Sequence, residues 1–265
     1  MNIANESELD QFIKEYPEIN MLEILMPDMN GIVRCKRIPR GEFGTFFRHG
    51  VKGPASTTLL NVRGEFCDEV DFAGLEGDPD KLIHPIANTL APITWLKSDT
   101  AQVLATFTEL DGSAALFDSR NILIKALQPL QAMNLKPIVA TELEFYLLKN
   151  GEGNVPEPLL GKIPGTQIDQ PGTQYAMPED LWDNDAFLED VRKACEVQNV
   201  PMTTVHSEFS PGQFEINLHH VDDPVSACDH AILLKRIVKG VAREHGMAAT
   251  FMAKPFMDVP GSGLH

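Results

Sequence analysis

The alternation of apolar and polar residues predicts strands along most of the chain. Residues 21–26 and 32–38 are rich in apolar side chains, and the sequence Asp28-Met29-Asn30-Gly31 between them is typical of a β-hairpin turn. Further strands are expected at 101–110, 137–149, 203–208, 213–219 and 248–254. Both halves of the chain are therefore expected to contain a sheet.

Apolar residues at helical spacing predict helices between these strands. They cover 7–15, a segment from Asp118 or Ser119 to Met133, 178–198 and 223–245. Ser7 is the expected N-cap of the first helix, and Gly246 directly follows the last one. Pro129 lies inside the second helix, so its final turn is the weakest part of that prediction.

The distribution of glycine and proline indicates two domains. Residues 41–100 contain many of both and only short apolar pieces, which favours a small β-rich first domain. Beyond them, strands alternate with long helices, as in α/β or α+β proteins. We place the boundary near residue 112, which gives domains 1–112 and 113–265.

Composition narrows the classes of partner. The 265 residues are 43% hydrophobic and 23% charged, ordinary values for a globular chain that builds its core without disulfides. Lys and Arg number 22 and Asp and Glu 38, so the net charge is −16 and the pI about 4.8. Such a surface repels nucleic acid and anionic membranes and attracts cations and amines. We expect neither a nucleic-acid nor a membrane partner.

The cysteines and the N-terminus indicate a cytoplasmic protein. Cys35, Cys67, Cys195 and Cys228 form no CxxC pair and no zinc-finger spacing with histidine. The first residues lack the basic and apolar regions of a secretory leader, and no apolar run approaches the roughly 18 residues of a membrane span. Reduced thiols are therefore expected.

Two of the expected strands carry carboxylates on one face. Alternation places Glu142, Glu144 and Tyr146 on one side of the strand at 137–149. The strand at 213–219 has Glu215 on its polar side, and Glu208 ends the strand before it. Neighbouring like charges are costly unless they meet water, arginine or a cation. The pattern therefore allows either a solvated outer face or a carboxylate-lined site for Mg²⁺ or Mn²⁺.

Other chemical motifs give little further direction. The Gly-Ser-Gly-Leu-His segment at 261–265 offers an imidazole that would suit such a metal site, although a single histidine is weak support. The chain contains no Walker A sequence, no GxGxxG after a strand, no GxSxG and no HExxH. Most familiar nucleotide-binding and hydrolase patterns are thus unsupported.

Several of these segments together match a known family in order and spacing. They are Glu142-Leu143-Glu144-Phe145, Glu208 with the segment 212–217, the segment 250–255, and Gly261 to His265. Segments 28–39 and 111–121 agree as well. The whole pattern resembles the glutamine synthetase superfamily, and it is most similar to the gamma-glutamylpolyamine synthetase branch, typified by gamma-glutamylputrescine synthetase.

The resemblance implies an α+β fold. It consists of an N-terminal β-grasp domain and the first part of a catalytic domain with a curved antiparallel sheet and flanking helices. It also implies that ATP phosphorylates the γ-carboxylate of glutamate and that an amine displaces the phosphate, with active sites between subunits of stacked rings. By this likeness Glu144, Glu208 and Glu215 hold one Mg²⁺ or Mn²⁺, Glu142 and His265 help to hold a second, and Gly261 lies at the glutamate.

The chain departs from glutamine synthetases that use ammonia. Pro260 stands where those enzymes have an asparagine, and Val51 to Ser56 lacks the aspartate of an ammonium-binding motif. A larger amine such as putrescine is therefore the expected acceptor, with ammonia as the alternative. Family members also continue well past the segment that ends at His265, so we expect this chain alone to be catalytically incomplete. A non-catalytic regulatory relative is the third possibility.

Overall fold

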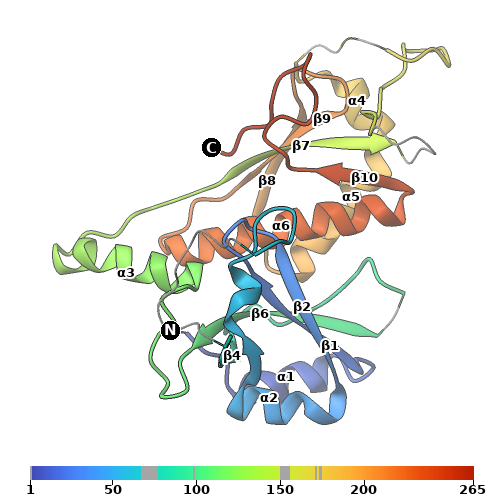
Figure 1. Ribbon diagram of the computed structural model, residues 1–265. Coiled ribbons are helices and arrows are strands. Elements are labelled where there is room, and N and C mark those ends of the chain that lie inside the picture. Colours follow the sequence, from blue (N-terminus) through green and yellow to red (C-terminus); the bar gives the residue numbers. More distant parts are fainter. Residues whose placement is uncertain (1, 67–76, 98, 150–155, 171, 173–174) are drawn as a thin grey trace. The chain divides into compact units, whose positions relative to one another are not determined.

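Strands from each half of the chain form two separate sheets in this computed structural model, which describes residues 2–66, 77–97, 99–149, 156–170, 172 and 175–265. Contacts divide the chain into two units, Met1–Lys136 and Pro137–His265. This division falls after the helix that follows residue 112, whereas the sequence placed the boundary before that helix. Each unit has its own sheet and its own helices (Figure 1).

The sheet of the first unit has the strand order β2-β1-β6-β4-β3, with β5 pairing with β6. Its strands are β1 (Met21–Pro27), β2 (Val33–Pro39), β3 (Val51–Pro54), β4 (Asp80–Pro85), β5 (Ala91–Pro92) and β6 (Thr100–Thr108). The antiparallel pairing of β1 with β2 confirms the predicted hairpin. Strand β1 also runs parallel to β6, which is buried along its whole length.

Helices cover this first sheet. They are α1 (Glu6–Glu15), α2 (Phe43–His49) and the 3₁₀ turns η1 (Arg40–Glu42) and η2 (Ala55–Thr58). The predicted N-cap of α1 was wrong by two positions, because Asn5 rather than Ser7 accepts the backbone N–H of Glu8. Helix α2 was not predicted. It is buried through Phe43, Phe46 and Phe47, which join the apolar core of β1, β4 and β6.

The second unit contains an antiparallel sheet with the order β10-β7-β9-β8. Its strands are β7 (Glu142–Lys149), β8 (Met202–Ser207), β9 (Gln213–Leu218) and β10 (Met247–Thr250). Strands β8 and β9 lie close to their predicted positions. Strands β7 and β10 are shorter than predicted: β7 starts at Glu142 rather than Pro137, and β10 ends at Thr250.

Three helices belong to this second sheet: α4 (Pro178–Asp183), α5 (Asp185–Val197) and α6 (Pro224–Glu244) (Figure 1). The single helix predicted over 178–198 is therefore two, because Asn184 leaves helical geometry between α4 and α5. Helix α6 begins at the cap Asp223 and ends before Gly246, whose φ of 69° suits glycine. Both of its ends confirm the sequence prediction.

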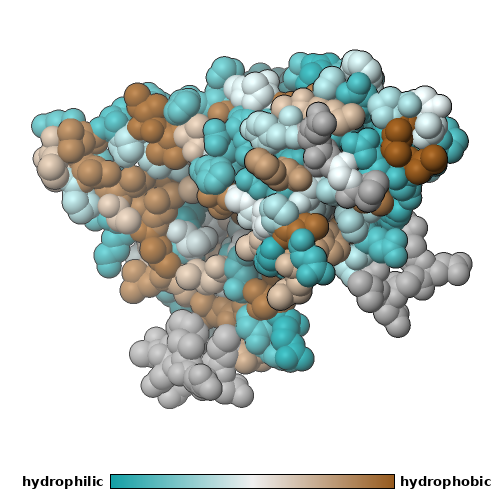
Figure 2. All heavy atoms as spheres, turned by 90° about the horizontal axis from the view of Figure 1, so that it is seen from above, coloured by the Kyte–Doolittle hydropathy of each residue, from teal (hydrophilic) through white to brown (hydrophobic). Residues whose placement is uncertain are grey.

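Helix α3 (Ser119–Ala132) is attached to the first unit by its N-terminus. Asp118, one of the two predicted caps, caps it, and its only buried residue is Asn121. Its apolar side chains stay partly or fully exposed, and hydrophobic residues gather on the side of Figure 2 where α3 lies. The exposed ones on and beside it include Leu116, Ile122, Met133 and Leu135.

Two further predictions concern the described residues. No helix in the described part of the chain is long and apolar enough to cross a membrane. Cys195 is buried, Cys35 and Cys228 are exposed, and Cys67 lies outside the described residues.

Candidate metal centre

The acids of β7 share one face of the second sheet. The opposite face is apolar, because Leu143, Phe145 and Leu147 are buried there at 2% exposure or less. On this apolar face the ring of Phe145 stacks on the ring of Phe214, its paired residue on β9. Glu142 and Glu144 therefore project from the other face, as the period of two predicted.

Antiparallel pairing of β7 with β9 brings acids of the two strands together. Glu144 lies directly opposite Glu215, and Glu142 lies opposite Asn217. Like charges at paired positions are destabilising, since the Cβ atoms of such pairs are only about 5 Å apart. Asn217 relieves part of this repulsion, because its Nδ2 donates a hydrogen bond of 2.9 Å to Glu215 Oε1.

Strand β8 and the turn after it add an imidazole and a further acid. His206 pairs with Glu215 across β8 and β9, and its Nε2 lies 3.0 Å from Glu208 Oε1 and 3.9 Å from Glu215 Oε1. Glu208 and Glu215 are both buried, at 9% and 7% exposure. The ligand atoms of these three residues lie within 4.8 Å of one another.

The segment 261–265 completes the cluster from the other side. Its backbone pairs with the start of β7: His265 N–H donates to Glu142 O, and Glu144 N–H donates to Gly263 O. This pairing places His265 Nδ1 3.6 Å from Glu142 Oε2. Glu142, Glu215 and His265 form a second group whose ligand atoms lie within 4.8 Å of one another. Glu215 belongs to both groups.

Glu144 is held differently from the other acids. Among the described residues it joins neither group of three. Its Oε2 accepts a hydrogen bond of 2.8 Å from Gln213, whose amide also donates to Gly261 O at 3.0 Å. A Cβ built on Gly263 would lie 2.7 Å from Glu144 Oε1, so only glycine leaves room for this carboxylate.

We call Glu142, Glu144, Glu208, Glu215, His206 and His265 the acid cluster. Within the described residues no lysine or arginine forms an ion pair with its carboxylates, whose ionic partners are His206 and His265. Buried carboxylates are costly without a compensating charge. Oxygen donors with added imidazole are the set that Mg²⁺ and Mn²⁺ accept. Bound divalent cations would therefore supply the positive charge that these carboxylates lack within the described residues.

The negative charge of the cluster affects nearby tyrosines. Loss of solvation, followed by the charges of Glu208, Glu215, Glu144 and Glu142, raises the pKa of Tyr175. Its hydroxyl lies 3.2 Å from His206 Nε2 and its ring packs against the exposed ring of Phe209. Burial and the charges of Glu144 and Glu208 likewise raise the pKa of Tyr146.

All of the predicted residues Glu142, Glu144, Glu208, Glu215, His265 and Gly261 come together at one end of the second sheet. His206, Tyr175 and Gln213 lie beside them and were not among the predicted site residues. His206 was detectable, because it stands two residues before Glu208 on a predicted strand. Tyr175 lies in a loop to which no pattern points.

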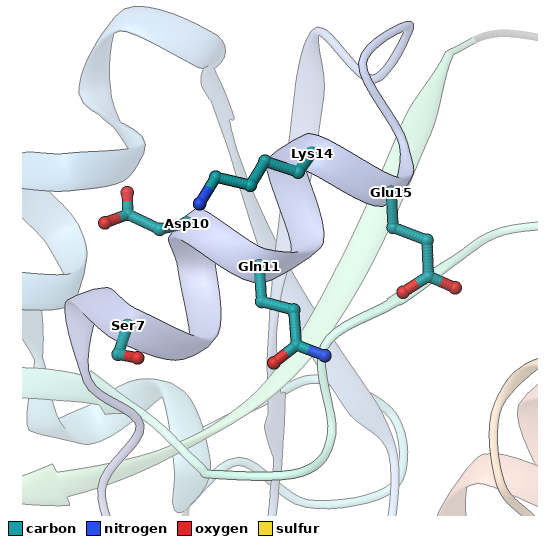
Figure 3. A pocket seen from close by; sticks show the side chains of 5 residues that line it. All are labelled: Ser7, Asp10, Gln11, Lys14 and Glu15. Carbon is teal, nitrogen blue, oxygen red and sulfur yellow. The ribbon is translucent and has the colours of Figure 1, made fainter.

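A separate hollow lies beside α1 in the first unit (Figure 3). Five exposed polar side chains of that one helix line it: Ser7, Asp10, Gln11, Lys14 and Glu15. These residues belong to neither group of metal-ligating side chains. The acid cluster is therefore the stronger candidate site.

Comparison with known proteins places these features in a family context. Residues 116–265 match the family described as "Glutamine synthetase, catalytic domain". The chain is 35% identical to gamma-glutamylputrescine synthetase of Escherichia coli, over 99% of this chain and 55% of that protein. It is 30% identical to glutamate–isopropylamine ligase of a Pseudomonas species, over 96% of this chain and 54% of the relative.

A solved structure supports the fold. The cryo-electron microscopy structure of Plasmodium falciparum glutamine synthetase superimposes on this chain with a TM-score of 0.76 at 18% identity. The match covers 100% of this chain and 53% of the other. The predicted α+β fold is thereby confirmed. The chain spans about half the length of the curated relatives that it matches.

Proposed function

This chain belongs to the glutamine synthetase family, and from that premise we propose that it is part of an ATP-dependent ligase joining the γ-carboxylate of glutamate to an amine. In the proposed reaction ATP phosphorylates the carboxylate, and the amine then displaces phosphate to form the amide. The acid cluster is the observation that carries the proposal. It gathers acids from β7, from β9 and from the turn after β8, together with His206 of β8 and His265, at one place.

Divalent cations are the proposed occupants of the acid cluster. We assign Glu144, Glu208 and Glu215 to one Mg²⁺ or Mn²⁺, and Glu142 with His265 to a second. The ions would neutralise charge on the phosphates of ATP and on the transferring phosphoryl group. The chain's own task is to hold the carboxylates in fixed orientation, which it does through the β7–β9 register and the backbone bonds of 261–265.

An organic amine is the proposed acceptor, and putrescine is the first candidate. The named activities of the E. coli and Pseudomonas relatives both involve amines larger than ammonia. Pro260 replaces the asparagine of ammonia-using enzymes, and the region of β3 and η2 lacks their aspartate. Ammonia as acceptor is the alternative, and a regulatory role without catalysis is the third reading.

Assembly, nucleotide and location are proposed as well. We propose that the whole protein forms a homo-oligomer of stacked rings, that it uses ATP, and that it acts in the cytoplasm. The net charge of −16 supports cationic amines over nucleic acids as ligands, because a negative surface raises the local concentration of cations.

The test is an amine panel with the whole protein as the cell makes it. Phosphate release is measured with glutamate, ATP, Mg²⁺ and either putrescine, isopropylamine, methylamine or ammonium. We expect putrescine to give the largest kcat/KM, at least about 10-fold above ammonium, since buried polar contacts to a substrate discriminate by at least this factor. Faster turnover with ammonium would instead identify a glutamine synthetase.

Two variants tie any activity to the acid cluster. Glu215→Gln removes the carboxylate that both groups share, and activity should fall by about 100-fold or more, because even outer partners of a metal contribute 10–100-fold. Glu196→Gln is the matched control, since this exposed acid lies on α5 and pairs only with Arg192 among the described residues. Absence of turnover with every amine would favour the regulatory reading.

A further inference from the structure

Gln213 links the acid cluster to the loop at 260–263. It is 1% exposed and begins β9, where its backbone pairs with Tyr146 of β7. Its side-chain nitrogen donates to Glu144 Oε2 at 2.8 Å and to Gly261 O at 3.0 Å. Both partners are acceptors, so the amide nitrogen rather than the amide oxygen has to face them.

Tyr146 anchors the neighbouring carbonyl of the same loop. Its hydroxyl donates a hydrogen bond of 2.6 Å to Pro260 O, and the side chain is fully buried. The paired positions Tyr146 and Gln213 thus hold two consecutive carbonyl groups. The loop is also held from its other side, because Ser262 N–H donates to Ala253 O at 2.9 Å.

This arrangement fixes the orientation of a peptide group. In a trans peptide the N–H points opposite to the carbonyl. When Pro260 O faces Tyr146, Gly261 N–H faces away from it, and within the described residues this N–H donates no hydrogen bond. A Cβ on Gly261 would lie 2.3 Å from the backbone oxygen of Ala253, so a larger residue at this position would clash with the backbone.

The Glu144 carboxylate is clamped between the same two elements. Gln213 holds Oε2, and Gly263 of the loop borders Oε1. The Gln213 amide therefore connects the Glu144 carboxylate to the loop by two hydrogen bonds. Within the described residues no other hydrogen bond or ion pair to this carboxylate occurs.

We propose that Gln213 is a positioning residue that couples cation binding at Glu144 to glutamate binding at the 260–263 loop. The proposal rests on the function proposed above and on the family resemblance, which implies that Gly261 lies at the glutamate. Coupling of this kind is reciprocal: glutamate tightens the cation by the factor with which the cation tightens glutamate. Gln213 touches neither ligand in this scheme and acts through Glu144 and Gly261.

The test measures Mn²⁺ binding to the whole protein by calorimetry, with and without saturating L-glutamate, in the absence of ATP and turnover. In the wild type, glutamate should tighten Mn²⁺ binding. Gln213→Met keeps the side-chain length but loses both donors. We expect it to weaken Mn²⁺ binding by about 10-fold or more, as removal of outer partners of a metal does. In this variant the Mn²⁺ affinities measured with and without glutamate should differ by no more than about twofold.

Two matched variants separate coupling from a general loss of stability. Tyr146→Phe removes only the anchor of Pro260, so Mn²⁺ affinity without glutamate should stay within about twofold while glutamate binding weakens. Gln198→Met replaces another buried glutamine, at the C-cap of α5, and should leave Mn²⁺ affinity and the glutamate effect unchanged. If Gln213→Met does not fold, Gln213→Asn replaces it, because one methylene less prevents simultaneous contact with both acceptors.

The outcomes distinguish this proposal from the function on which it rests. A wild-type protein that binds no Mn²⁺ contradicts the metal site itself. A wild type that binds Mn²⁺ and glutamate, with Gln213 variants that keep both the affinity and the coupling, overturns the role of Gln213 alone. Equal losses in the Gln213 and Gln198 variants would show a structural effect and would likewise overturn it.

Discussion

Single residues of the acid cluster have little freedom. Glu215 faces Glu144 across the sheet, accepts from Asn217, and lies in both groups of metal-ligating atoms. Gly263 leaves the space that the Glu144 carboxylate occupies. The geometry of the site therefore depends on the lack of a side chain at Gly263 as well as on the charged residues.

Gly263→Ala tests this dependence. Its Cβ would lie 2.7 Å from Glu144 Oε1 and 3.0 Å from the ring of His265, so one of these groups has to move. We expect Mn²⁺ affinity, measured by calorimetry, to fall by about 10-fold. Gly41→Ala is the control, because a Cβ there meets no atom within 4 Å. Unchanged affinity in Gly263→Ala would mean that Glu144 is not a fixed ligand.

Cys195 gives a second prediction at this scale. Burial raises the pKa of its thiol to about 12, and the residue is 1% exposed in the core beside α6. The thiolate is the reactive form, so iodoacetamide at pH 8 should leave Cys195 unmodified in the native protein. Peptide mapping by mass spectrometry should find it alkylated only after denaturation. Rapid labelling of the native protein would contradict the buried position of α5.

Elements differ in how firmly their ends are fixed. Helix α3 is fastened to the first unit through its cap, since Asp118 Oδ2 accepts from Phe107 N–H at 2.7 Å and from Thr106 Oγ1 at 3.0 Å. Asn121 adds two bonds, to Phe107 O and Ala115 O. The rest of the helix contributes no buried side chain.

Asp118→Ala should therefore detach the start of α3 from β6. The substitution removes a helix cap and leaves the buried N–H of Phe107 without its partner, which together cost about 2–4 kcal/mol. Urea unfolding followed by circular dichroism measures the loss. Asp223→Ala at the cap of α6 is the comparison: that acid is exposed, so removal should cost only about 1 kcal/mol.

The sequence predicted elements best where caps and long apolar stripes mark their ends. Helices α3 and α6 and the β1–β2 hairpin carry such signals, whereas α2 is seven residues long and owes its stability to Phe43, Phe46 and Phe47 in a tertiary core. The acids of β7 and β9 were predictable because alternation is local. The bonds of Gln213 were not, since they join β9 to residues of β7 and to a loop distant in the sequence.

The whole molecule divides its tasks between two units. The acid cluster lies entirely in Pro137–His265, and no residue of the first unit is among its ligands in the described part of the chain. A bound cation should therefore stabilise one unit selectively, by an amount that grows with the logarithm of its concentration.

Hydrogen–deuterium exchange can measure this selectivity. Addition of Mg²⁺ or Mn²⁺ to the whole protein should slow amide exchange in β7, β9 and the segment 261–265. Exchange in β1, β2 and β6 should change little, since cations act there only through weak surface charge. Ca²⁺-free buffer with EDTA is the reference state. Equal protection of both sheets would show that the cation site is not confined to the second unit.

The tether between Tyr146 and Pro260 has a consequence for biosynthesis, because the two residues stand 114 positions apart in the chain. On the ribosome, β7, β8 and β9 emerge well before the segment that supplies His265 and the loop. During that interval the acids of β7 and β9 repel one another, and the side of β7 that later pairs with residues 263–265 lies open to other nascent chains. The order of translation thus makes the arrival of residues 260–265 the step at which the start of β7 gains this backbone partner.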